Sequence, residues 1–348
     1  MATKQFPTLL DLTATTGTNT AIKVVQIIQT YAPELELFGG RPINGLTYEV
    51  TRLRELPGGT AFRAVNQPVL ATAGKWEKVL GQCFRIDRPV QIDRALVEAQ
   101  MAQYGGAAEN FEASMVEQQM RALGILLGKQ FYTGRTQDAL GFDGLTSFVD
   151  NSPYTCVDAG GTTAGACSSA WIVYNAPEGI HWTYGNGKGL NSAVWQDQQI
   201  QAYVSGTSGA LGTIPMRVNN ISGWLGLANN APLTRTNQTD LIACVRIANL
   251  KRTIGGVNAN GLTDSLIASA KKLFPLSISN NPGSLTLLVN RFDALNLANS
   301  RMAAFSSGKS AITVAGPLQY SDEAGSSCGI KIVQTDSIAI TDNQVVIA

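Results

Sequence analysis

The segment AAENFEASMVEQQMRALGILLGKQFY, residues 107–132, carries the clearest periodic pattern in the chain. Val116, Met120, Leu123, Leu127 and Phe131 follow one another at intervals of three or four residues, the spacing of one face of an α-helix. Glutamates near its beginning and a lysine near its end suit the partial charges of a helix. At about 1.5 Å per residue it would be roughly 39 Å long, which is long for a globular protein. We therefore predict one long helix with an apolar face on a core.

A charged hairpin is predicted ahead of this helix. The segment GLTYEVTRLRELPGGTAFRAVNQP, residues 45–68, contains two strand-like runs joined by Pro57-Gly58-Gly59, a strong turn signal. Apolar residues alternate up to Val50, and Arg52 and Arg54 then take their place on the same face. Because an isolated hairpin is marginal in water, this one needs a surface that its own residues do not supply.

The remaining segments mix strand and helix patterns, so the predicted fold class is α+β. The strand-like segments are residues 79–93, 170–185 (a hairpin turning at 175–179), 284–290 and 328–347 (strand, turn, strand). The helix-like segments are residues 240–250, 263–274 and 291–303. Residues 20–30 fit a helix or a strand.

Composition narrows the class of protein. Glycine accounts for 35 of 348 residues and charged residues for 15%, against usual shares of about 7% and about 25%. This favours many turns and a surface covered by other copies or partners. A net charge of +1 provides no drive for strong nonspecific binding to nucleic acid. We expect no signal peptide and no membrane span, because a basic start with an apolar run and a stretch of about 18 apolar residues are both missing.

The cysteines indicate free thiols. Cys83, Cys156, Cys167, Cys244 and Cys328 are scattered and odd in number, which favours packed thiols in a chain made in the cytosol. Cys156 and Cys167 flank a glycine-rich loop, but nothing supports a disulfide between them. Since no C-x-x-C pair occurs, a zinc or redox site of that type is not expected.

No catalytic set is found in the sequence. His181 is the one histidine, so a two-histidine metal site is excluded, and its place beside Trp182 favours a structural role. No G-x-S-x-G elbow presents a serine, and the glycine-rich residues 185–189 lack the Ser or Thr that follows the lysine of a P-loop. We expect no enzyme activity, no cofactor and no metal. Together with the composition, hairpin and long helix, this favours a self-assembling structural protein.

The order of short motifs along the chain resembles a known family. The motifs are FYTG at 131–134, FDGL at 142–145, SAWIV at 169–173, GWLGL at 223–227, VRIAN at 245–249 and LVNR at 288–291. In this order they resemble the major capsid proteins of tailed bacteriophages, which have the Hong Kong 97-type fold shared with herpesvirus shells. The resemblance covers nearly the whole chain, although Val289 replaces a family cysteine and the turn at 188–190 is one residue short.

The resemblance implies a division of the chain into five parts. These are an N-terminal arm (1–44), an extended loop reaching over a neighbouring subunit (45–95), a peripheral domain with a spine helix (96–164), an axial domain (165–310) and strands returning to the peripheral domain (311–348). The implied interface residues of the extended loop are Arg52, Arg54, Glu55, Arg63, Lys75 and Lys78. Some relatives crosslink a loop lysine to a neighbour's asparagine, for which Lys75 and Lys78 are candidates without a matching motif.

The resemblance also implies a function. Hexamers and pentamers of the chain would form an icosahedral head shell around double-stranded DNA, without sequence-specific binding. Scaffolding and portal proteins, and in some phages a decoration protein, would be partners, with assembly in the host bacterial cytoplasm and a final place in the virion. The alternatives are another virion or binding protein, such as a tail component or β-rich adhesin, and an enzyme. The predicted long helix disfavours the first, and the lone His181 disfavours the second.

Overall fold

A computed structural model describes residues 31–55, 57, 62, 65–66, 68, 72–104, 108–185, 190–192, 195–203, 211–231, 242–251, 260–306 and 326–347. The chain forms two compact units. The first comprises Met1–Leu46, Cys83–Gly128 and Thr183–Gly226, and the second Thr47–Gln82, Lys129–Trp182 and Leu227–Ala348. Within the described residues, no helix combines the length and apolar character needed to cross a membrane. The segment at 20–30, predicted as helix or strand, lies outside the described residues.

The predicted long helix is confirmed as α5, Ala108–Thr133. All five residues of its predicted apolar face, from Val116 to Phe131, are buried. The helix ends where Gly134 adopts a φ of 57°, a left-handed conformation that glycine accepts without strain. A side chain at Gly134 would also overlap the backbone of Gly144, so this residue serves both the helix end and the turn packed against it.

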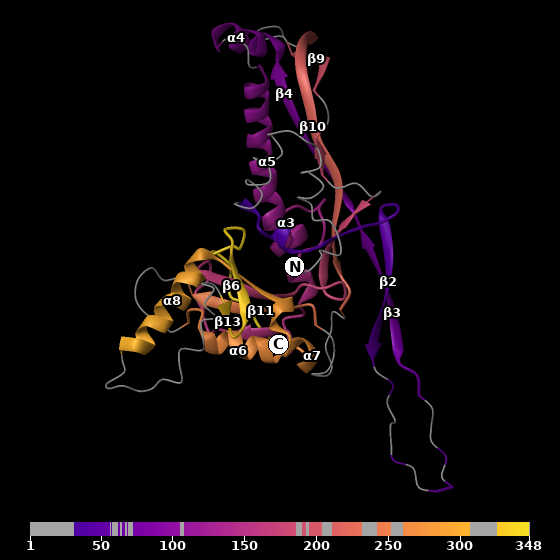
Figure 1. Cartoon of the computed structure of the whole chain (residues 1–348), viewed down its shortest axis with the longest axis vertical. Helices are drawn as coiled ribbons and strands as arrows, with labels where there is room; N and C mark the ends of the chain where they lie inside the picture. Colours follow the sequence, from indigo (N-terminus) through magenta and orange to yellow (C-terminus); the bar gives the residue numbers. More distant parts are fainter. Residues whose placement is uncertain are drawn as a thin grey trace. The chain divides into compact units, whose positions relative to one another are not determined.

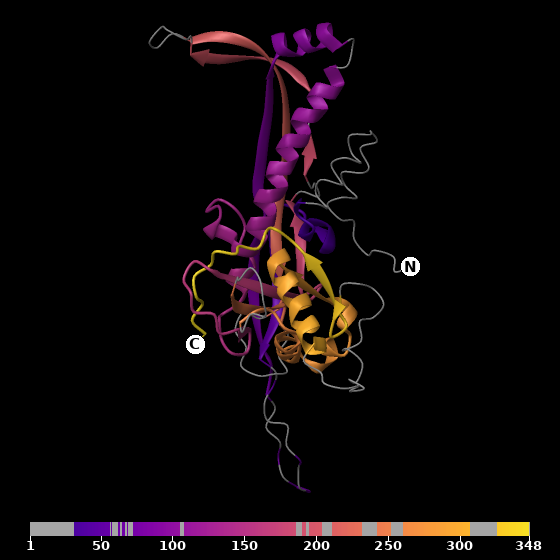
Figure 2. The same ribbon diagram turned by 90° about the vertical axis from the view of Figure 1, so that its left-hand side faces the viewer.

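In the first unit, α5 lies alongside a long antiparallel sheet (Figures 1 and 2). The longest strand is β10, Leu211–Asn229, and β4, Phe84–Asp93, pairs with it from Met216 to Leu225. The other strands of this sheet are β1 (Gly40–Pro42), β7 (Ile180–Tyr184), β8 (Asn191–Ser192) and β9 (Gln196–Tyr203). Pro89, which lacks a backbone N–H, suits β4 because β4 ends the strand order among the described residues.

Polar contacts join the helix to this sheet. Arg88 Nε donates a hydrogen bond of 2.8 Å to Gln119 Oε1, and Arg217 Nε lies 2.6 Å from Glu112 Oε1. Two short helices complete the described elements of the unit, α3 (Glu34–Leu37) and α4 (Arg94–Tyr104). The long helix and the long strands are therefore held together along their length by side-chain pairs as well as by apolar packing.

The second unit is built on a mixed sheet with the order β13-β14-β12-β6-β11-β5. Its strands are β5 (Cys156–Asp158), β6 (Cys167–Tyr174), β11 (Cys244–Lys251), β12 (Leu285–Val289), β13 (Ser326–Ser327) and β14 (Ile330–Gln334). Its helices and turns are α6 (Asp264–Lys272), α7 (Leu276–Ser279), α8 (Arg291–Ser306), η1 (Gly134–Thr136), η2 (Leu145–Phe148) and η4 (Pro282–Ser284). Thr263 caps α6 by accepting from Leu266 N. Apolar residues of β6, β11, β12, α6 and α8 share one core.

The predictions for this unit are partly confirmed. The strand at 284–290 and the helices at 263–274 and 291–303 are found as β12, α6 and α8. The predicted helix at 240–250 is wrong, because residues 244–251 form strand β11 between β6 and β5. Strand pairing on both sides decides its conformation, and β-branched Val245 and Ile247 fit a buried strand well.

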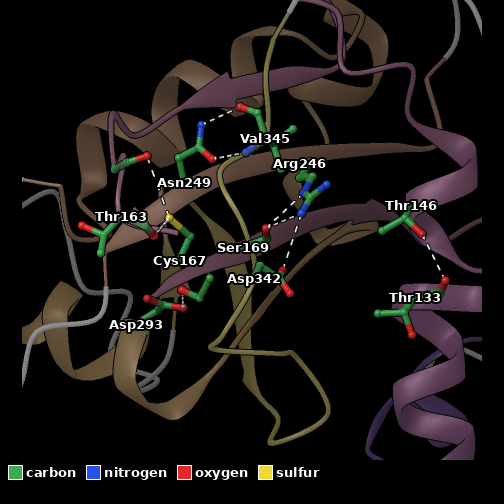
Figure 3. Close-up of polar contacts among 12 residues, drawn as sticks. Thr133, Thr146, Thr163, Cys167, Ser169, Arg246, Asn249, Asp293, Asp342 and Val345 are labelled. Carbon is green, nitrogen blue, oxygen red and sulfur yellow. Dashed lines mark hydrogen bonds and ion pairs between the residues drawn. The ribbon is translucent and has the colours of Figure 1, made fainter. Parts of the chain in front are cut away.

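Two predicted strand pairings are also wrong. Residues 170–185 do form two strands, but β6 and β7 belong to different sheets, since each pairs with other neighbours. At the C-terminal end only β14 forms, and residues 335–347, called the strap below, cross the end of the second unit's sheet without forming a strand (Figure 3). Since β14 pairs with β12, the ranges predicted as axial domain and returning strands share one sheet.

The thiols and the histidine are placed as expected. Cys83, Cys156, Cys167 and Cys244 are buried and free, and Cys328 is half-buried and free. Burial raises the pKa of Cys156 to about 11 and that of Cys244 to about 12, so neither thiol ionises at neutral pH. His181 is buried in β7, which agrees with the predicted structural placement.

Candidate assembly surface

The predicted hairpin exists, but with a different second strand. In the described part of the chain, β2 (Thr47–Glu55) and β3 (Lys75–Gln82) pair antiparallel with each other alone. The turn predicted at Pro57-Gly58-Gly59 lies largely outside the described residues, and the described partner of β2 begins at Lys75. Residues 60–68 contain Arg63 but no acidic residue, whereas β3 places Glu77 opposite Arg52. Charge complementarity thus favours the later partner.

One face of this hairpin is matched within the hairpin itself. The register sets Tyr48 opposite Gly81 and Val50 opposite Val79. A β-carbon at Gly81 would overlap the ring of Tyr48, so the missing side chain of Gly81 makes room for the aromatic ring. Tyr48 and Val79 are half-buried as a result. This aromatic cover over glycine stabilises the register.

The other face is exposed and carries two large apolar side chains. Trp76 and Leu80 project on this face and are 67% and 77% exposed. Lys78 lies between them in sequence, and its Nζ is 2.6 Å from Glu49 Oε1 on β2. The hydrogen bond and charge of Glu49 raise the pKa of Lys78. We call the residues Glu49, Trp76, Lys78 and Leu80 the open face of the hairpin.

A buried cysteine of the first unit follows the hairpin in the sequence. Cys83 N donates a hydrogen bond of 2.8 Å to Leu46 O, and its Sγ lies 3.5 Å from Thr183 Oγ1 on β7. The run predicted at 79–93 is divided here into β3 and β4. Within residues 45–95, β2 and β3 form the hairpin, and β4 joins the sheet with β10.

We compared the whole chain with protein families, curated proteins and solved structures. No protein-family model and no curated protein matches it. The structure of bacteriophage epsilon15 is similar over 100% of both chains, with 16% sequence identity and a TM-score of 0.60. The chain has a tailed-phage major capsid protein fold. The bacteriophage JBD30 capsid is also similar, with 11% identity, coverage of 89% of this chain and 92% of that chain, and a TM-score of 0.45.

The match confirms the predicted α+β phage capsid fold, and the assignment rests on the epsilon15 structure. A third similar structure, from Mycobacterium phage Adephagia, has 9% identity, covers 63% of this chain and 90% of that chain, and has a TM-score of 0.45.

The predicted interface residues of the capsid-protein fold lie on or next to the hairpin. Arg52, Arg54 and Glu55 are in β2, and Glu55 is opposite Lys75 at the start of β3. Lys78 is on the open face, and Arg63 lies outside the described residues. Sequence reasoning from charge missed Trp76 and Leu80. Their signal was the period-two spacing of Trp76, Lys78 and Leu80 in KWEKVLGQ, which places all three on one side of a strand.

Proposed function

We propose that this chain is the major capsid protein of a tailed phage and self-assembles into the icosahedral head shell that encloses the double-stranded DNA genome. The observation that carries the proposal is the likeness to the epsilon15 structure over 100% of both chains. A second observation supports it: the hairpin leaves Trp76 and Leu80 exposed, as expected of a surface that neighbouring copies cover.

In this proposal each part of the chain has a role in assembly. Residues 1–44 are the N-terminal arm, α5 is the spine helix of the peripheral domain, and residues 165–310 contain the axial domain that meets its copies in pentamers and hexamers. The extended loop is narrowed from 45–95 to the hairpin of β2 and β3. Its proposed contacts are with a neighbouring subunit through Arg52, Arg54, Glu55, Arg63, Lys75 and Lys78, to which the open face adds Trp76 and Leu80.

The proposed partners follow from the same role. Scaffolding and portal proteins assist assembly in the host bacterial cytoplasm, a decoration protein is a further candidate, and the finished shell belongs to the virion. The net charge of +1 suits a wall that contains DNA without binding it tightly. Neither catalysis nor a cofactor has a part in this role. A lysine crosslink is not proposed, since the Lys78 ammonium is paired with Glu49.

Expression of the full chain, alone and together with the products of neighbouring genes, tests the proposal. Sedimentation and negative-stain electron microscopy should reveal closed shells of uniform diameter. A chain that stays monomeric under all of these conditions would overturn the shell assignment. Tubes or single rings in place of closed shells would favour the alternative, a tail component.

A further inference from the structure

The strap, residues 335–347, crosses one end of the second unit's sheet (Figure 3). There β12 and β11 end and β6 begins. Because β12 pairs with β6 only between Trp171 and Tyr174, the edge of β6 at Cys167 is left for the strap. Asp342 of the strap pairs with this edge through its backbone. Its N–H donates to Cys167 O at 2.9 Å, and its C=O accepts from Cys167 N at 3.2 Å.

Asn249 on β11, the strand beside β6, also binds the strap. It lies where the register between β11 and β6 shifts, with a φ of 59°. Its side chain accepts a hydrogen bond of 2.7 Å from Val345 N and donates one of 2.9 Å to Val345 O (Figure 3). One carboxamide thus satisfies both backbone groups of a strap residue, as a neighbouring strand would.

Arg246 makes the third contact from beneath the strap. This residue is 8% exposed, and its guanidinium donates to Ser169 Oγ at 3.0 and 2.9 Å and stacks 5.2 Å from the ring centre of Trp171. Asp342 supplies the nearby negative charge, with Oδ2 at 3.7 Å from Arg246 Nη2. A buried cation depends on such a partner, so the strap and Arg246 stabilise each other.

The strap is attached in two different ways along its length. Thr335, Ser337 and Ile338 are buried, and Ile338 O accepts a hydrogen bond of 3.1 Å from Asn290 Nδ2. From 339 to 347 no residue is buried, and the contacts just described are polar. Polar contacts at a solvent boundary are individually weak, whereas the buried residues before them form a stable anchor.

We propose that residues 339–347 are a latch that opens and closes on the folded second unit, hinged after Ile338 and held shut by Asn249 and Arg246. Opening frees the β6 edge at Cys167 and, among the described residues, leaves Ser169 as the hydrogen-bond partner of the Arg246 guanidinium. The latch is thus a conformational device that controls exposure of this sheet end without unfolding the core.

Hydrogen exchange on the full-length chain tests this, read in peptides that cover 339–347 and, for the core, 285–289. Asn249→Gly keeps the left-handed backbone accessible and removes both bonds to Val345. We expect exchange in 339–347 to rise at least tenfold while exchange in β12 stays within twofold of the wild type. Asp342→Asn, which retains the backbone bridge and removes the charge, should produce a smaller increase in the same peptides.

Asn260→Ala is the matched control, because it removes an amide bond of 3.0 Å to Gly160 O that lies outside the strap. It should leave exchange in 339–347 unchanged. The proposal is overturned if peptides 339–347 and 285–289 accelerate together in Asn249→Gly, since the strap would then open only with the whole unit. Wild-type exchange in 339–347 at the rate of a free peptide would overturn it as well, because no closed latch would exist.

Discussion

Arg217 on β10 and Glu112 on α5 form a 2.6 Å ion pair in which the carboxylate side chain is 8% exposed and the guanidinium side chain 33% exposed. The pair joins the long helix to the longest strand of the first unit, and Asp197 of β9 lies 3.3 Å from the same guanidinium. Loss of the cation would leave the Glu112 carboxylate buried without its neutralising partner, which costs more than the pair itself contributes.

We therefore expect Arg217→Ala to lower the free energy of unfolding by about 2 kcal/mol, a value reduced from that of a fully buried pair because Arg217 is partly exposed. Urea unfolding measures the change. Arg121→Ala is the matched control, since Arg121 pairs with Glu117 at the same distance of 2.6 Å on the more exposed side of α5. Its effect should stay below about 0.5 kcal/mol. Equal losses of unfolding free energy in Arg217→Ala and Arg121→Ala would contradict the view that the buried carboxylate of Glu112 makes its pair more important.

Gly81→Ala should disrupt the hairpin, because a β-carbon there overlaps the Tyr48 ring. The rest of the chain should keep its stability, and assembly into shells should fall. Hydrogen exchange in peptides of β2 and β3 measures the first effect, and the yield of sedimenting particles the second. Adding Tyr48→Ala to Gly81→Ala removes the overlap, so the double variant should exchange no faster than Tyr48→Ala alone. Faster exchange in the double variant would show that the overlap is not the cause.

Arg52→Glu with Arg54→Glu should leave the subunit folded and impair shell assembly, because the proposed partners of these arginines lie on another chain. The register provides a control, since Arg52 is opposite Glu77 within the hairpin. Arg52→Glu combined with Glu77→Arg restores opposite charges inside the hairpin while still reversing the charge at position 52. If this swap restores assembly fully, the defect arises within the hairpin and not at a subunit contact.

Trp76→Ser and Leu80→Ser should reduce assembly without lowering the stability of the isolated chain. Both side chains are largely exposed, so their removal costs little in the subunit, while an interface that covers them would lose apolar contact area. Particle yield and urea unfolding of the unassembled chain separate the two effects. Leu140→Ser, at a residue that is 85% exposed in a loop away from the hairpin sequence, is the control. Normal particle yield from both hairpin variants would remove the open face from the proposed contacts.

Asp293 should contribute less to the stability of the second unit at neutral pH than in mild acid. This residue is buried at the start of α8 and accepts a 2.6 Å hydrogen bond from Ser168 Oγ. Burial raises the pKa of Asp293 to about 6, against the opposing effect of the hydrogen bond from Ser168. A carboxyl whose pKa is raised by folding stabilises the folded chain below its usual pKa, and this stabilisation is lost as pH rises through about 6.

As pH rises from the usual pKa of an aspartate through about 6, the contribution of Asp293 to the free energy of unfolding should fall by on the order of 3 kcal/mol. Urea unfolding between pH 4 and pH 7.5 measures it as the difference between wild type and Asp293→Asn. The asparagine retains an oxygen that accepts from Ser168 and does not titrate, so this variant should show a flatter pH dependence. Parallel curves for the two proteins would exclude Asp293 as the source.

Local patterns in the sequence predicted the elements whose conformation depends on their own residues. The stripe from Val116 to Phe131 defined α5, and the apolar run at 285–289 defined β12. Long-range pairing was harder to predict. Residues 240–250 fit a helix by local pattern, and only the neighbouring β6 and β5 make them a strand. The hairpin strand β2 likewise pairs with Lys75–Gln82, a distant segment that provides Glu77 opposite Arg52 and Gly81 opposite the Tyr48 ring.

The interface residues named from the sequence stay predictions. The sequence pointed to the charged residues around the hairpin, and β2 and β3 do carry most of them. The exposed pair Trp76 and Leu80 was missed because its alternation becomes meaningful only once the strand and its partner are known. The domain boundaries stay predictions.

The burial of the cysteines has a practical consequence for following assembly. With Cys83, Cys156, Cys167 and Cys244 buried, and the pKa of each raised, maleimide reagents at neutral pH find little thiolate to attack. After replacement of the half-buried Cys328 by serine, one new cysteine at the exposed position 140, outside the open face, would carry a fluorescent dye with little background labelling. Assembly can thus be followed by single-site spectroscopy without altering the residues proposed to make the contact.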